Sequence, residues 1–233
     1  TAATIPFPIF KYSVNYAEQN GVVVMSLDAD GIADERDANG ESIYQEDKEL
    51  FRLSYQNGKW STLEQLTDDD TADANPQLAI DASGDQILVW VQDKQLTSVK
   101  NFDMAAPATI WQDDSYSSNL ADFKLTSTPD GRMAIVWAQP SANASDLMAV
   151  FYDPALDVWG QPKQITDDSA TEQYMTAGFY GEQSLMAVYN RTEMDLDAFA
   201  AQLDGNNIQS AVPETESDLY YANYALHGDL AIE

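Results

Sequence analysis

The stretch Asn75–Trp90, which reads NPQLAIDASGDQILVW, recurs loosely 47 residues later over Asp122–Trp137 as DFKLTSTPDGRMAIVW. Each copy contains an apolar segment, a turn with Asp and Gly, and a second run of large apolar residues that ends in Trp. Glycine suits such a turn because a positive φ angle costs it little. The two copies therefore predict one β-hairpin that is used twice.

Further glycines and tryptophans extend this register along the chain. Glycines precede apolar runs at Gly21, Gly84, Gly131, Gly181 and Gly228. A second series falls at intervals of 51 and 48 residues, at Trp60, Trp111 and Trp159. Four short strands in each unit of about 45–50 residues are typical of a β-propeller blade. We therefore expect the tryptophans to be core residues that pack one blade against the next.

The predicted fold class is all-β, a β-propeller of four-stranded antiparallel blades that forms a single domain over residues 1–233. The predicted blades cover about residues 11–73, 74–119, 120–171 and 172–218, and residues 219–233 begin a fifth. Residues 1–10 are long enough to add one outer strand to that fifth blade. We expect the chain to be part of a longer propeller rather than a closed ring with one thin blade.

Three segments carry a resemblance to a known group of repeats. They are Asn75–Trp90, Asp130–Trp137 and the stretch from Tyr152-Asp153 to Trp159-Gly160. These segments resemble the divergent repeats of secreted bacterial propellers that are related to sialidase-like (BNR-like) proteins. The resemblance covers most of the chain, and it implies a propeller fold and a location that is secreted or at the cell surface.

Charge and composition exclude several classes of protein. The chain has 39 Asp plus Glu and 11 Lys plus Arg, so its formal net charge is −28. Such a field repels phosphate backbones and anionic lipids, which argues against nucleic acid and membrane insertion. The predicted partners are divalent cations and a glycan or protein ligand. The chain has no cysteine and one histidine, His227, so thiol catalysis, disulfides and multi-histidine zinc sites are excluded.

One acidic segment has the spacing of a calcium loop. Counted from Ser26 as position 1, oxygen-bearing residues fall at positions 1, 3, 5, 9 and 12, and position 7 can offer a backbone carbonyl. The six predicted calcium ligands are Ser26, Asp28, Asp30, Ile32, Asp34 and Asp37. This is the ligand spacing of an EF-hand loop, and it also resembles the calcium-binding repeats of thrombospondin type 3. Calcium is therefore the predicted cofactor.

Blade geometry predicts where the other acidic segments lie. The loop between the second and third strands lies on the same rim as the connection to the next blade. Those connections contain Asp68–Asp70, Asp113-Asp114 and Asp167-Asp168, so the segments and the predicted calcium loop should share one rim.

These features favour a non-enzymatic binding or structural module of a secreted or cell-surface protein, in which calcium stabilises the acidic loop. The alternative is a glycoside hydrolase, sialidase-like or another propeller glycosidase, that uses two carboxylates. Candidate carboxylates for that alternative include Asp73, Asp81, Asp122 and Glu172, but acidic residues are too abundant to identify a pair. A protein-binding scaffold at the central channel also remains open.

Overall fold

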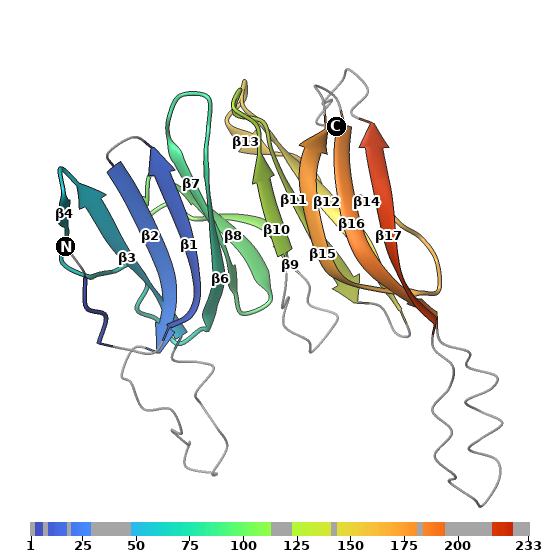
Figure 1. The fold of residues 1–233 in the computed structure, drawn as a ribbon, viewed down its shortest axis with the longest axis horizontal. Helices are drawn as coiled ribbons and strands as arrows, with labels where there is room; N and C mark the ends of the chain where they lie inside the picture. Colours follow the sequence, from blue (N-terminus) through green and yellow to red (C-terminus); the bar gives the residue numbers. More distant parts are fainter. Residues whose placement is uncertain are drawn as a thin grey trace, which may run out of the picture.

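A computed structural model describes residues 3–6, 9–17, 20–28, 48–112, 123–140, 144–180, 184–193 and 216–225. The regular elements within these ranges are β-strands, and nearly all neighbouring strands pair antiparallel (Figure 1). The predicted all-β fold class is therefore confirmed. No helix in the described part of the chain is long and apolar enough to span a membrane.

Two separate sheets form the N-terminal half. The first contains β1 (Ile9–Ala17), β2 (Asn20–Asp28), β3 (Lys48–Gln56) and the short strands β4 (Lys59–Trp60) and β5 (Glu64–Gln65), which both pair with β3. The second contains β6 (Asp73–Ile80), β7 (Gln86–Gln92), β8 (Gln95–Lys100) and β9 (Ala108–Gln112) in sequence order. Each sheet is thus an antiparallel meander, which is the form of a propeller blade.

The C-terminal half forms two further meanders. The third sheet contains β10 (Phe123–Ser127), β11 (Met133–Pro140), β12 (Ser145–Asp153), β13 (Val158–Trp159) and β14 (Lys163–Gln164). The fourth contains β15 (Thr171–Tyr180), β16 (Ser184–Glu193) and β17 (Glu216–Ala225). A single parallel bridge from Ser145 to Thr171 joins these two meanders.

The strand pairing corrects the predicted start of a fifth blade at residue 219. Strand β17 pairs antiparallel with β16 over its full length, from Glu216 opposite Glu193 to Ala225 opposite Ser184. Residues 219–225 are therefore part of a third strand of the fourth sheet. The first strand likewise begins at Ile9, within the segment that was expected to complete a fifth blade. Alternating apolar residues predict a strand, but they do not specify which neighbour it pairs with.

Successive sheets pack face to face, and buried apolar residues fill each interface. Side chains alternate along β7, so Leu88 and Trp90 face the first sheet while Ile87, Val89 and Val91 face the third. Strand β11 repeats this pattern. Its Met133, Ile135 and Trp137 face the second sheet, while Ala134 and Val136 face the fourth. Trp90 and Trp137 are almost completely buried, which confirms their prediction as core residues.

The first strand of each sheet lies beside the first strand of the next. Ser13 in β1 accepts a hydrogen bond from the backbone nitrogen of Leu78 in β6, at 3.1 Å. The Gln77 side chain of β6 donates to the carbonyl of Phe123 and accepts from the amide of Leu125 in β10. Strand β10 in turn contacts β15. These inner strands therefore form a continuous row across the four sheets.

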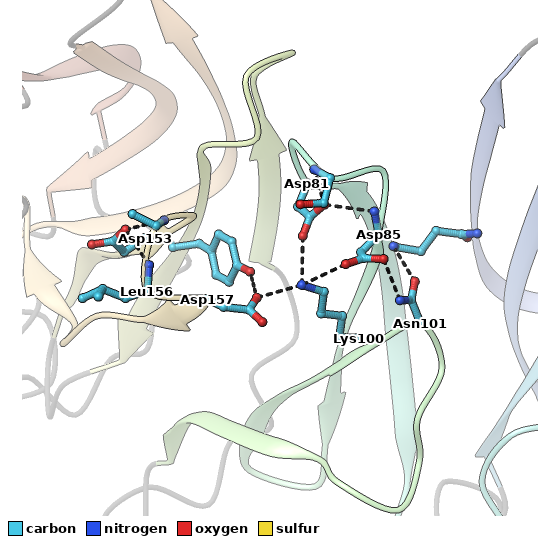
Figure 2. A network of polar contacts seen from close by, with 11 residues as sticks. Asp81, Asp85, Lys100, Asn101, Asp153, Leu156 and Asp157 are labelled. Atoms are coloured by element: carbon cyan, nitrogen blue, oxygen red, sulfur yellow. Dashed lines mark hydrogen bonds and ion pairs between the residues drawn. The ribbon is translucent and has the colours of Figure 1, made fainter.

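The second and third sheets are also joined at the rim where their first hairpins turn. Figure 2 shows Lys100, at the end of β8, between carboxylates from both sheets. Its ammonium nitrogen lies 3.1 Å from Asp81, 3.0 Å from Asp85 and 2.9 Å from Asp157. The hydroxyl of Tyr152 also donates to Asp157, and this bond together with Lys100 lowers the pKa of Asp157. These ion pairs join the second and third sheets, and we call the cluster the Lys100 clamp.

We predict different outcomes for the same substitution at two hairpin glycines. Gly84 and Gly131 both have a φ of 87°, but a Cβ at Gly84 would meet open space, whereas one at Gly131 would overlap the backbone of Ala82 in the neighbouring sheet. Gly84→Ala should cost about 1 kcal/mol, because it adds only backbone strain. Gly131→Ala should cost clearly more in a urea denaturation experiment. Equal losses would contradict this close approach of the two blades.

Candidate functional site

Two segments 99 residues apart have nearly the same sequence and the same position in the fold. Residues 65–73 read QLTDDDTAD and residues 164–172 read QITDDSATE. The first links the first and second sheets, and the second links the third and fourth. We call these regions the first junction (Glu49, Thr67, Asp69, Asp73 and Gln92) and the second junction (Asp146, Thr166, Asp168, Glu172 and Arg191).

Strand register shows that Asp73 and Glu172 are equivalent. Asp73 pairs with Gln92 and Glu172 pairs with Arg191, and an irregularity in pairing follows each acidic residue at the same distance. Both residues are fully buried. A serine hydroxyl from the preceding sheet donates to each backbone carbonyl, from Ser26 to Asp73 at 2.6 Å and from Ser145 to Glu172 at 2.8 Å. The chain therefore places a carboxyl group at the same buried point of two blades.

The surrounding contacts are repeated as well. The hydroxyl of Thr67 accepts from the amide of Leu50, and the hydroxyl of Thr166 accepts from the amide of Leu147. Glu49 accepts from the amide of Asp69 at 3.1 Å, as Asp146 accepts from the amide of Asp168 at 3.3 Å.

These contacts place both described acidic segments beside the start of the third strand of the preceding sheet. The sequence predicted that the acidic segments lie on this rim, where the second strand of a blade connects to the third. Asp113 and Asp114 lie outside the described residues.

The two junctions differ in two of their side chains. At the first, the Trp90 indole donates to Asp73 at 2.7 Å, whereas Tyr189 occupies the equivalent position in the fourth sheet. At the first junction Gln92 donates to Asp69, whereas at the second the guanidinium of Arg191 bonds Asp168 at 3.0 and 3.2 Å. The second junction therefore contains a cationic side chain where the first has a neutral amide.

Burial, together with the nearby Asp168 and Asp146 carboxylates, raises the pKa of Glu172 to about 7, while Arg191 and the side chain of Thr166 oppose the rise. Neither carboxylate oxygen of Glu172 has a hydrogen-bond partner among the described residues. Burial also raises the pKa of Asp73 to about 7, although the Thr67 hydroxyl and the Trp90 indole oppose it. Asp73 therefore has a hydrogen bond from Trp90 that Glu172 lacks, and near neutral pH both carboxyl groups are partly protonated.

The other carboxylates singled out from the sequence have different surroundings. Asp81 is buried and paired with Lys100, at the hairpin rim of the second sheet. Asp122 lies outside the described residues. In the repeat it aligns with Asn75 and not with Asp73.

The predicted calcium loop stays a prediction. Ser26 lies in β2, where its hydroxyl is buried and donates to the Asp73 carbonyl. Asp28 ends the same strand and pairs with Lys48 across to β3. The other predicted ligands, Asp30, Ile32, Asp34 and Asp37, lie outside the described residues.

Comparisons with known proteins identify a shared fold at low sequence identity. A polysaccharide lyase of family PL25, an ulvan lyase, matches with a TM-score of 0.54 and 12% identity over 91% of this chain. This chain spans half of the lyase chain.

Two glycosidases match at lower TM-scores, and no family model or curated protein matches. The catalytic domain of a GH62 α-L-arabinofuranosidase from Coprinopsis cinerea matches at 0.47, with 14% identity over 96% of this chain and 69% of that one. The GH43 protein BlXynB from Bacillus licheniformis also matches at 0.47, with 12% identity over 95% of this chain and 44% of that one.

These findings correct the prediction of a non-enzymatic module. The polysaccharide lyase that shares this fold is a carbohydrate-active enzyme, and the structure brings together buried carboxyl groups that the sequence could not select. That prediction relied on the degenerate repeat, the acidic face and the shortage of catalytic residue types, but glycosidic bonds are cleaved by carboxyl groups alone. The findings fit the alternative prediction better, which is a glycoside hydrolase that uses two carboxylates.

We predict that Glu172 makes stability depend on pH. Its pKa rises from about 4.5 in the unfolded chain to about 7 in the folded one, so the folded state binds more protons between these values. The contribution is therefore full below about pH 4.5 and is lost as the pH rises through 7, at a cost on the order of 3 kcal/mol. Glu172→Gln should remove this loss in urea denaturation at acidic and at mildly alkaline pH. Parallel curves for both proteins would contradict it.

Proposed function

We propose that this chain is a carbohydrate-active enzyme that cleaves glycosidic bonds, with Glu172 as the proton donor. The observation that carries the proposal is the state of this carboxyl group. It is fully buried, both of its oxygens are unpartnered among the described residues, and its pKa is raised to about 7. A general acid must hold its proton near the working pH, and a carboxylic acid does so only when its surroundings disfavour the anion.

The second junction also supplies a second carboxylate in a different environment. Asp168 is partly exposed, and its Oδ2 atom is ion-paired with the guanidinium of Arg191. Glycoside hydrolysis commonly uses one protonated and one ionised carboxyl group on either side of the bond. We assign the ionised role to Asp168, because its Oδ2 atom forms an ion pair with Arg191, while burial disfavours the anion of Glu172.

A glycan substrate is proposed because the fold is shared with a polysaccharide lyase, and hydrolysis because the chain offers paired carboxyl groups. Glu172 is fully buried in this structure. Transfer of its proton to a glycan therefore requires the residues that cover it to move, as in enzymes whose sites open and close around substrate.

The test is a depolymerisation screen on neutral and acidic polysaccharides, read as new reducing ends and as unsaturated products. Wild-type protein should release reducing ends, and Glu172→Gln should lower the rate by about a hundredfold or more, because it removes a general acid while keeping the side-chain shape. Activity should also fall as the pH rises above about 7, as the donor loses its proton.

Asp130→Asn is a suitable control. Asp130 is an exposed carboxylate that pairs with Arg132 beside the turn between β10 and β11. This variant should keep wild-type activity. A wild-type protein that releases no product from any glycan would refute the proposed function, and an active Glu172→Gln variant would refute the role of Glu172. Unsaturated products would show a lyase rather than a hydrolase.

A further inference from the structure

The first junction repeats the acidic groups of the second without its cation. Each junction brings together three carboxyl groups, which are Glu49, Asp69 and Asp73 at the first and Asp146, Asp168 and Glu172 at the second. Arg191 pairs with Asp168 at the second junction. At the first junction Gln92 takes the same position, and its amide donates to Asp69 at 3.0 Å. Among the described residues, no Lys or Arg is ion-paired with the three carboxylates of the first junction.

Two carboxylate oxygens of the first junction are buried and unsatisfied. Glu49 is 3% exposed and Asp73 is fully buried, and the Glu49 Oε2 and Asp73 Oδ2 atoms have no hydrogen-bond partner among the described residues. The Thr67 side chain interacts with both carboxyl groups, and the two groups repel each other. Both carboxyl groups therefore lie within reach of one threonine, and each has one oxygen without a partner. A buried charge without compensation is strongly destabilising.

We propose that the first junction binds a divalent cation through Glu49 Oε2 and Asp73 Oδ2, and that this cation supplies the positive charge that Arg191 supplies at the second junction. Carboxylate oxygens are the ligands that hard cations such as Ca²⁺ prefer, and water completes their coordination. No three acidic or histidine side chains among the described residues converge at metal-ligand spacing. The proposed site therefore has two protein carboxylates, with Asp69 adding negative charge beside them.

This site is distinct from the predicted loop over residues 26–37. The two are close, because the Ser26 hydroxyl donates to the Asp73 carbonyl. Binding at the junction would link β3 of the first sheet to β6 of the second, and so stabilise the contact between these blades.

The experiment is a thermal melt at constant ionic strength, with calcium chloride, with magnesium chloride and with a chelator. Calcium should raise the melting temperature of the wild-type protein more than magnesium does, because Mg²⁺ keeps its water shell and demands stricter geometry. Glu49→Gln and Asp73→Asn should each lose most of the calcium-dependent shift. Asp73→Asn keeps an acceptor for the Trp90 indole, so it preserves the bond that Asp73 now makes.

Gln92→Arg is the matched gain-of-charge variant. It should copy the Arg191–Asp168 pair at the first junction, raise the melting temperature in chelator and reduce the calcium-dependent shift. The double variant Asp34→Asn/Asp37→Asn tests the loop separately and should keep the shift.

Two results would overturn the proposal. A calcium shift that survives in Glu49→Gln and Asp73→Asn but disappears in the loop variant would place the ion in the loop. The absence of any calcium shift in the wild-type protein, together with a higher melting temperature for Glu49→Gln, would mean that the two carboxyl groups share a proton instead of an ion.

Discussion

Coverage of both apolar faces of each sheet is the constraint on which the rest of this structure depends. A four-stranded meander such as β6–β9 presents large apolar side chains on both sides, with Trp90 on one and Val89 on the other. It is stable in water only between two neighbours, so the sheets must stack in sequence order. This stacking places the first strands side by side and carries the segments between sheets across the interfaces. The junctions and the Lys100 clamp are consequences of that arrangement.

Repetition gives the molecule two copies of one buried acidic arrangement, and a few substitutions make the copies chemically different. Trp90 satisfies one oxygen of Asp73, whereas both oxygens of the equivalent Glu172 are left without partners among the described residues. Arg191 brings a positive charge to the second junction, and Gln92 brings none to the first. One copy is therefore suited to holding a proton and the other to holding a cation. The physical reason is that a buried carboxyl group must be neutral, paired or metal-bound.

Much of the fold could be predicted because hairpins carry local signals. Gly84 and Gly131 have the positive φ angles expected of their turns, and Trp90 and Trp137 are buried as the repeat indicated. The partner of β17 could not be predicted, because its alternating pattern fits a first strand as well as a third. The candidate site was predicted only in part. Asp73 and Glu172 were among the carboxylates considered, but with 39 acidic residues nothing in their type or spacing separated them from the rest.

The sequence by itself determined the class of fold, the position of the hairpins and the excess of negative charge, because these follow from composition and from the spacing of neighbouring residues. Only the tertiary structure decided which carboxyl groups lose water, which of them find partners and which cation lies beside them. The raised pKa of Glu172 depends on burial and on charges such as that of Asp146, which is distant in the chain and is brought near by the packing of one blade on the next. The segments TDDDTAD and TDDSATE are similar in sequence, but their different chemistry appears only when their neighbours, Gln92 and Arg191, are placed in space.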